Sequence, residues 1–215
     1  MDANPSEAFD FARAAFLQSA PNLAACPPDV GAEVAFAGRS NAGKSSALNA
    51  LARRGGLARV GKSPGVTRLI NFFRLDEAGA LRLVDLPGYG YARVSRAELR
   101  AWGRELHHYL AGRRSLRALV LFADCRLPLQ EGDWQLLRWC AAAALPVRVV
   151  LTKADKLGRG AALAACRARA RELAAAGCEA AGVQIFSAPK QWGVAELSEF
   201  LAARLAAPTV VESPS

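Results

Sequence analysis

Short, continuous runs of apolar residues recur along the chain and are separated by segments with helical spacing. Three such runs are Glu33–Ala37, Ala118–Asp124 and the run that begins at Val147 and leads into "TKAD". Strands that are buried on both faces of a parallel sheet show this continuous pattern rather than strict alternation. The pattern therefore predicts central, buried strands.

Two further apolar segments, "RLINFFRL" and "LRLVDL", are separated by the turn-like "DEAGA", which predicts a β-hairpin. The segment 96–112 has helical spacing, with Leu99, Trp102, Leu106 and Leu110 on one side. We expect further helices over 44–54, after each central strand and near 194–206, with a last strand at 183–186.

This order predicts a three-layer α/β fold with a mostly parallel sheet of about six strands, one of them antiparallel, and helices on both faces. Residues 1–30 are expected to form an N-terminal extension with a possible helix carrying Phe9, Ala12 and Phe16. We expect one globular domain over 31–207 and a frayed tail over 208–215.

The composition is typical of a globular protein and indicates neither a membrane span nor a disulfide framework. The longest apolar candidate, "CAAAALPV", is far shorter than the roughly 20 residues of a spanning helix. The N-terminus carries acids where a signal peptide needs basic residues. The five cysteines are widely spaced without a CxxC pair. We therefore expect a cytoplasmic protein with reduced cysteines.

The net charge of +9 favours a polyanionic partner, with nucleic acid preferred to membrane. Five basic residues and no acid lie between Arg53 and Arg68, and seven arginines against two glutamates lie between Arg93 and Arg117. The alternative is that these arginines only solvate helix faces.

The segment Gly38–Ser45, "GRSNAGKS", satisfies the phosphate-loop pattern G-x-x-x-x-G-K-[ST] between a predicted strand and a predicted helix. Its glycines let backbone N–H groups converge on phosphates at a helix N-terminus. Lys44 would contact the β and γ phosphates, and the Ser45 hydroxyl would be a ligand of Mg²⁺.

The sequence "DLPG" follows the second hairpin strand, about 40 residues after Ser45. Asp85 would hold Mg²⁺ through water, and the Gly88 N–H would reach the γ-phosphate. Thr67 would complete the Mg²⁺ shell only while a γ-phosphate is present, or it is an ordinary surface residue.

The sequence "TKAD" follows a buried strand and indicates which base is bound. The Asp155 carboxylate can accept the N1–H and the exocyclic amine of guanine together, whereas adenine offers no such pair of donors. The Lys153 stem would cover one face of the base, and the Ala188 N–H in "FSAPK" would reach the guanine carbonyl. The nucleotide is therefore expected to be GTP or GDP.

Together, "GRSNAGKSSALNAL", "GKSPGVTRLINFF", "DLPGYGYARV", "TKADK" and "FSA" resemble the EngB/YihA (YsxC) family of bacterial ribosome-assembly GTPases, in the TrmE-Era-EngA-YihA-Septin-like superfamily. The resemblance covers about Glu33 to Leu205. It implies a P-loop NTPase fold of the small GTPase type, GTP binding with Mg²⁺, action in maturation of the large ribosomal subunit, and a link to cell division and septum formation. We expect a monomer without membrane association.

The resemblance implies nucleotide contacts from Gly38, Arg39, Ser40, Asn41, Ala42, Gly43, Lys44, Ser45, Gly65, Val66, Thr67, Arg68, Leu69, Asp85, Leu86, Pro87, Gly88, Thr152, Lys153, Ala154, Asp155, Phe186, Ser187 and Ala188. The Mg²⁺ ligands would be Ser45 and Thr67. The groups that act on the reacting phosphate would be Lys44, Asn41, Thr67 and Gly88. Pro189 stands where many GTPases have lysine.

Two features bear on the rate of hydrolysis. Tyr89 occupies the position where many signalling GTPases carry the glutamine that orients the attacking water, so we predict slow turnover. In similar GTPases an asparagine at the position of Asn41 can ligate K⁺ beside the phosphates, and the alternative is a hydrogen bond that stiffens the loop.

Two rival functions remain open. One is an RNA-binding module that holds guanine nucleotide without turnover, and the other is a phosphotransferase or nucleotide kinase, although Asp155 argues against ATP as donor. Tyr91, Trp102, His107 and His108 either stack on RNA bases or pack within the fold.

Overall fold

The computed structural model describes residues 9–57, 69–90 and 96–206, with the backbone alone for 96–102. The strands are β1 (Ala15–Ala20), β2 (Ala32–Gly38), β3 (Ile70–Arg74), β4 (Leu81–Asp85), β5 (Leu116–Asp124), β6 (Val147–Thr152) and β7 (Gly182–Ile185). The α-helices are α1 (Lys44–Leu51), α2 (Arg96–Gly112), α3 (Glu131–Ala142), α4 (Arg159–Ala175) and α5 (Val194–Ala206). Short 3₁₀ turns are η2 (Phe11–Arg13), η3 (Leu23–Ala25) and η5 (Ala154–Lys156).

The described strands form a seven-stranded sheet in the order β1-β3-β4-β2-β5-β6-β7. β2 pairs in parallel with β4 and β5, and β5, β6 and β7 continue in parallel. β3 pairs antiparallel with both β4 and β1 and is therefore the one strand that runs against the others. Parallel strands place their carboxyl ends at one edge of the sheet, where ligands bind in such folds.

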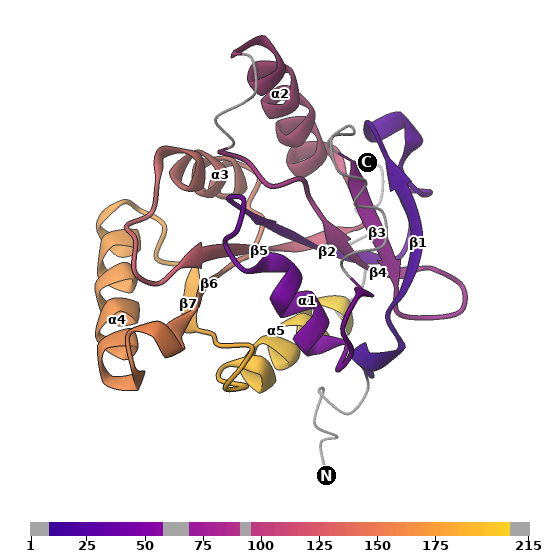
Figure 1. Cartoon of the computed structure of the whole chain (residues 1–215). Helices are drawn as coiled ribbons and strands as arrows, with labels where there is room; N and C mark the ends of the chain where they lie inside the picture. The colour runs from indigo at the N-terminus through magenta and orange to yellow at the C-terminus, as the bar shows by residue number, and fades with distance from the viewer. Residues whose placement is uncertain (1–8, 58–68, 91–95, 207–215) are drawn as a thin grey trace.

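Side chains alternate between two hydrophobic cores, one on each face of the sheet. Along β2, Val34 and Phe36 belong to the core that includes α1 and α5, whereas Ala35 and Ala37 belong to the core that includes α2 and α3. Figure 1 shows α1 and α5 in front of the sheet, with α2, α3 and α4 around its other side. The three-layer α/β fold predicted from the sequence is confirmed.

Most predicted elements are found where the sequence placed them, and two differ. The N-terminal helix over Phe9, Ala12 and Phe16 is wrong, because Ala15–Ala20 form the edge strand β1, and the sheet has seven strands rather than six. Phe16 lies opposite Phe73, with the ring centroids 6.1 Å apart, so pairing with β3 determines this conformation. Helix α1 also ends before Arg53, which has a φ of 50°.

A cluster of buried charges fixes the amino end of the sheet. Glu33, at the start of β2, lies 2.7 Å from Nε of Arg82 and accepts hydrogen bonds from Arg113 (2.6 Å) and from the hydroxyl of Tyr109 (3.0 Å). Arg82 also donates to the carbonyl of Gly79 at 2.8 Å. These contacts tie the last turn of α2 to β2 and β4.

None of the helices within the described ranges combines the length and the apolar character that a membrane crossing needs. All five cysteines have free thiols.

Candidate nucleotide-binding site

The loop between β2 and α1 has the backbone of a phosphate loop. Gly38, Asn41 and Gly43 have φ values of 153°, 62° and 92°, and the helix begins at Lys44. Asparagine tolerates the left-handed region better than most residues that carry a side chain, and glycine adopts it without strain. The loop turns its backbone toward the N-terminus of α1.

The glycines of this loop are also required for space. A Cβ at Gly38 would lie 2.5 Å from the carbonyl oxygen of Phe122, and one at Gly43 would lie 3.0 Å from Cβ of Thr152. The hydroxyl of Thr152 is 2.6 Å from the Ala42 carbonyl, to which it donates a hydrogen bond. The end of β6 therefore supports the phosphate loop directly.

Lys44 and Asp85 form a buried ion pair at the carboxyl edge of the sheet. Their side chains are 9% and 2% exposed. Gly88 follows closely, and a Cβ there would lie 3.3 Å from the Ser40 nitrogen. The backbone N–H of Ser40 donates to the Tyr89 carbonyl at 2.9 Å. The "DLPG" segment is thus joined to the phosphate loop.

Tyr89 is buried and its hydroxyl lies 2.5 Å from Oδ1 of Asp133 at the start of α3. The other carboxylate oxygen of Asp133 accepts the backbone N–H of Gln130 at 2.8 Å and so caps that helix. Burial and the Asp133 carboxylate raise the pKa of Tyr89 well above its usual range. The phenol is therefore held neutral and fixed to the first turn of α3.

The segments predicted to bind the base lie together. The Ala154 N–H donates to the Phe186 carbonyl at 3.1 Å, and the Ser187 hydroxyl donates to Oδ1 of Asp155 at 2.7 Å. This hydrogen bond lowers the pKa of Asp155, so its carboxylate is ionised and oriented. Its arrangement suits a ligand that presents two adjacent N–H donors.

Asp124, at the end of β5, is a site residue that sequence reasoning missed. Oδ2 of Asp124 lies 2.9 Å from Nζ of Lys153 and 2.7 Å from Arg126. The hydrogen bond from Arg126 is the main reason that the pKa of Asp124 is lowered. The ion pair with Asp124 holds the Lys153 side chain beside the phosphate loop. In the sequence, the only signal for the role of Asp124 was a charged residue at the end of a predicted strand.

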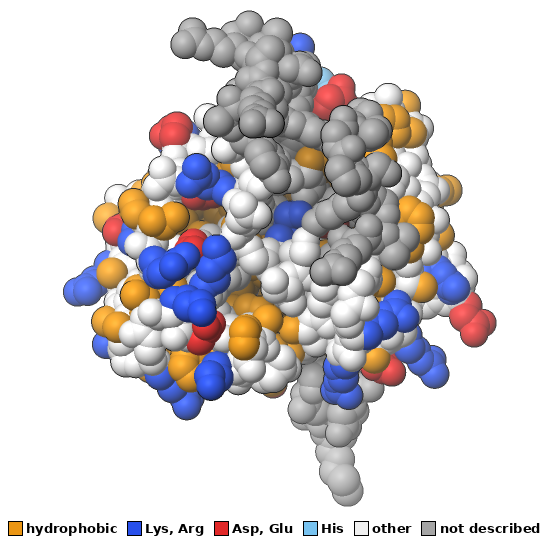
Figure 2. Space-filling model, in the orientation of Figure 1, with side chains coloured by type: hydrophobic (Ala, Val, Ile, Leu, Met, Phe, Trp, Pro, Cys, Tyr) orange, Lys and Arg blue, Asp and Glu red, His pale blue; other side chains and the backbone are white. Residues whose placement is uncertain are grey.

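The Arg39 side chain lies beside Gly90, two residues after the end of "DLPG". Its Nε would lie 3.0 Å from a Cβ at Gly90. With Asp124, Asp133 and Lys153 it lines a cavity of about 180 Å³ beside the phosphate loop. Figure 2 shows Lys and Arg side chains gathered over the α4 and β7 side of the molecule.

Most predicted nucleotide contacts fall on three described segments at one edge of the sheet: the phosphate loop, "DLPG", and the joined "TKAD" and "FSA" loops. Leu69 immediately precedes β3. Gly65, Val66, Thr67 and Arg68 lie outside the described residues. The roles assigned to all of these residues stay predictions.

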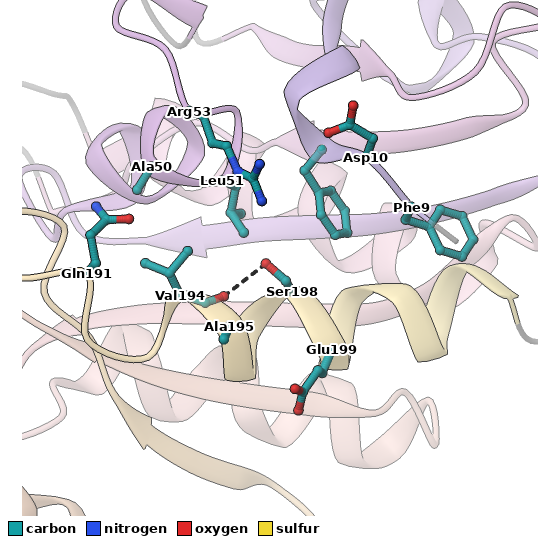
Figure 3. A pocket seen from close by; sticks show the side chains of 11 residues that line it. Phe9, Asp10, Ala50, Leu51, Arg53, Gln191, Val194, Ala195, Ser198 and Glu199 are labelled. Carbon is teal, nitrogen blue, oxygen red and sulfur yellow. Dashed lines mark hydrogen bonds between the residues drawn. The ribbon is translucent and has the colours of Figure 1, made fainter. Parts of the chain in front are cut away.

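A second cavity, of about 390 Å³, lies at the end of α1 away from the phosphate loop (Figure 3). Figure 3 shows Phe9 and Asp10 on one side and Val194, Ser198 and Glu199 of α5 on the other. The Ser198 hydroxyl donates to the Val194 carbonyl of its own helix at 2.9 Å. Among the residues that the structure describes, none of the predicted nucleotide contacts lines this cavity.

The sequence of the chain is similar to those of known GTP-binding proteins. The family described as "50S ribosome-binding GTPase" matches residues 33–153. The chain is 51% identical to a probable GTP-binding protein EngB of Methylococcus capsulatus over 186 residues, which cover 86% of this chain and 88% of that protein. The chain belongs to the EngB family. A second EngB relative, of Nitrosococcus oceani, is 49% identical over 89% of this chain and 96% of its own length.

Solved structures agree on the fold. A crystal structure of a probable EngB covers 81% of this chain and 98% of its own, with a TM-score of 0.64 and 21% identity. Era of Aquifex aeolicus, crystallised with GDP and AlF4⁻, covers 82% of this chain and 57% of its own, with a TM-score of 0.61 and 20% identity. At this identity the likeness is one of fold, which places this EngB-family chain among P-loop GTPases.

Proposed function

We propose that this chain binds GTP and GDP with Mg²⁺, hydrolyses GTP slowly, and acts as a nucleotide-gated factor in assembly of the large ribosomal subunit. The observation that carries the proposal is the oriented Asp155 carboxylate, which accepts the Ser187 hydroxyl at 2.7 Å and follows a strand whose Thr152 hydroxyl supports the phosphate loop at 2.6 Å. In this proposal, base selection and phosphate binding take place at the same edge of the sheet.

The chain's own groups have defined tasks in this proposal. The N–H groups of the phosphate loop and the Lys44 ammonium bind the phosphates, and the Gly88 N–H contacts the γ-phosphate. The oxygens of Ser45, Thr67 and Asp85 are the hard donors that Mg²⁺ prefers, and the metal would neutralise phosphate charge. Lys44 now pairs with Asp85, so nucleotide binding exchanges this contact for phosphate and metal contacts. Asn41 is the candidate ligand for K⁺.

Slow turnover fits the environment of Tyr89. Its hydroxyl is 2.5 Å from Asp133, so the side chain that follows "DLPG" is engaged in a helix cap rather than turned toward a water. We propose that a ribosomal partner accelerates the reaction. The cytoplasmic location, the monomeric state and the link to cell division and septum formation belong to this proposal on the strength of the family resemblance.

The base assignment is tested with Asp155→Asn. The amide of the variant can donate a hydrogen bond to the carbonyl that xanthine carries in place of guanine's exocyclic amine. The variant should therefore have a lower affinity for GTP and a higher affinity for xanthosine triphosphate. The ratio of the two affinities should change by about 10⁴, the order seen when a site mispairs its ligand. Titration calorimetry with both nucleotides measures this ratio. An unchanged preference for GTP would contradict the assignment.

The ribosomal role is tested by co-sedimentation with large subunits in GDP and in a non-hydrolysable GTP analogue, across a salt series. Comparison at matched salt separates gating from general phosphate attraction. We expect stronger binding with the analogue, and faster hydrolysis when subunits are added. Equal binding and no turnover would favour the RNA-binding module without catalysis. Phosphate transfer to a nucleotide acceptor would favour the kinase.

A further inference from the structure

A groove of about 580 Å³ lies between α2 and α3, and the nucleotide site does not use it. Its lining is aromatic and basic, and comes from Gly103, Arg104, His107 and His108 of α2 and from Gln135 and Trp139 of α3. None of these described lining residues is acidic.

The groove results from helical spacing on two facing helices. Arg104 and His108 are four residues apart on α2, as Gln135 and Trp139 are on α3, so each pair shares a helix face. The rings of His107 and Trp139 meet edge to face with centroids 5.4 Å apart. His107, His108 and Arg104 are exposed, and Trp139 is half-buried against the core.

These groups match the chemistry of an unpaired nucleotide. Aromatic rings give a base a stacking partner, a guanidinium attracts the phosphate, and an amide such as that of Gln135 can bond to a base edge. A peptide with an acidic side chain would use Arg104 but would leave the imidazoles and the indole without a planar partner. The lining therefore favours RNA bases over an acidic peptide.

The same helix connects the groove to the nucleotide site. α3 carries Trp139 in its last turns, and its first turn carries Asp133, which holds Tyr89 directly after "DLPG". Gly88, which is proposed to contact the γ-phosphate, directly precedes Tyr89 in the chain. A shift there would reach the start of α3, and so one wall of the groove, through the Tyr89–Asp133 hydrogen bond.

We propose that the α2–α3 groove binds unpaired bases of RNA, and that the Tyr89–Asp133 contact makes this binding depend on the bound nucleotide. The inference deepens the proposed function, on which it rests, by assigning the RNA-contacting surface. Two of its residues, His107 and His108, stand out in the sequence, and Trp139 supplies the stacking surface that they flank.

The direct test is fluorescence anisotropy with a labelled single-stranded oligouridylate and with an RNA duplex of equal length, at matched salt. Trp139→Leu keeps apolar bulk without the ring, and should weaken single-strand binding by about 5- to 150-fold, the fold-change for one lost stacking contact. Trp139→Phe should restore part of it. Neither variant should alter duplex binding.

A charge-matched comparison separates the groove from general basicity. Arg104→Gln should weaken single-strand binding and reduce the slope of log K against log salt by about 0.7. Arg171→Gln removes an exposed arginine of α4 and should change neither quantity. Equal losses in both arginine variants, or no loss in Trp139→Leu, would overturn the inference.

Gly103→Ala tests the groove with a substitution that should not destabilise the fold. The added methyl group would lie 3.8 Å from the Trp139 ring, an ordinary contact that narrows the groove. Alanine also favours the helix. We therefore expect a melting temperature that is unchanged or higher, together with weaker single-strand binding. Retention of full binding would count against the groove.

Co-sedimentation distinguishes failure of this inference from failure of the proposed function. If wild-type protein sediments with large subunits and Trp139→Leu sediments equally well, the groove assignment is wrong and the ribosomal role stands. If wild-type protein does not sediment but binds single-stranded RNA through the groove, the ribosomal role fails and the groove stands. Loss of sedimentation with unchanged oligonucleotide binding would mean that the groove docks a protein, and would overturn the RNA assignment.

Discussion

Buried charges lie at both ends of the paired strands β2 and β4, and the two sets are built differently. At the amino end, Glu33 lies opposite Arg82 and also contacts Arg113 and Tyr109. At the carboxyl end, Lys44 pairs with Asp85 beside the phosphate loop, where Gly38 and Gly43 have positive φ values. Both sets are almost completely removed from solvent.

The two sets of charges differ in whether a bound ligand can replace their protein partners. The Glu33 cluster is enclosed by backbone carbonyls and a tyrosine hydroxyl, and its charges have protein partners that no ligand replaces. Lys44 and Asp85 lie where the proposed ligand brings an anion for the one and a cation for the other. A buried ion pair is weak evidence for stability by itself, so its surroundings must indicate whether it clamps the fold or serves a site.

The largest effect that separates the two ends is expected from Lys44→Met. The substitution would remove the proposed charge-assisted hydrogen bonds to two phosphates, each worth about 1.5–3 kcal/mol, so nucleotide affinity should fall by roughly 10²–10⁴-fold. Titration of the purified variant with GDP and GTP measures it. Glu33→Gln is the matched control at the other end, and should leave affinity unchanged below its melting temperature. An equal loss in both variants would mean that the two ends are not independent.

Glu33→Gln should instead have the larger effect on folding. It leaves Arg82 and Arg113 without their carboxylate while keeping the side chain's shape, and breaking a buried pair in this way costs about 3–5 kcal/mol. Urea unfolding measures the change. The control is Arg114→Ala, whose 83%-exposed side chain lies 3.5 Å from Asp29 and should contribute less than about 1 kcal/mol. If Glu33→Gln lowers the free energy of unfolding by less than about 1 kcal/mol, the Glu33 cluster does not stabilise the fold as proposed.

The same comparison shows what the sequence can predict. The carboxyl end consists of contiguous motifs in which spacing and residue type carry the chemistry, and the structure brings those motifs to one edge as expected. Glu33 showed only as the first residue of an apolar run, because its partners are separated from it by 49 to 80 residues in the chain. Asp124 and Trp139 were missed for a similar reason, since each acquires its role from another element.

Strand β1 was mispredicted because local spacing was ambiguous. Phe9, Ala12 and Phe16 fit a helical stripe, whereas "AFLQSA" has no strict alternation, and the register with β3 even shifts between Phe16 and Gln18. Long-range pairing outweighed local pattern at this edge. By contrast, the helix predicted over 96–112 is found with the same bounds, because its apolar stripe is regular over several turns.

A smaller effect is expected from Tyr89→Phe, which removes the hydroxyl that reaches from the carboxyl end into α3. Loss of one hydrogen bond should lower the free energy of unfolding by about 1 kcal/mol. Basal GTP hydrolysis should persist, because Asp133 engages the phenol. A phosphate-release assay with excess nucleotide checks this. Abolished hydrolysis with normal GTP binding would instead make the phenol a catalytic group.

The smallest effect concerns Asp29, which lies beside the Glu33 cluster at the amino end. Burial disfavours its charge, but hydrogen bonds from the backbone and hydroxyl of Ser115 and from the Arg114 backbone outweigh this and hold its pKa at about 2. A carboxyl group whose pKa is lower in the folded state stabilises the fold above its unfolded pKa of about 4. That stability is lost as the pH falls from about 4 to about 2. Asp29→Asn should therefore cost less than about 1 kcal/mol at pH 7, because solvent still reaches the half-buried side chain, which is 29% exposed, and screens its charge. The difference in unfolding free energy from the wild type should shrink through this acid window. A difference that stays constant with pH would show that the side chain contributes through its shape rather than its charge.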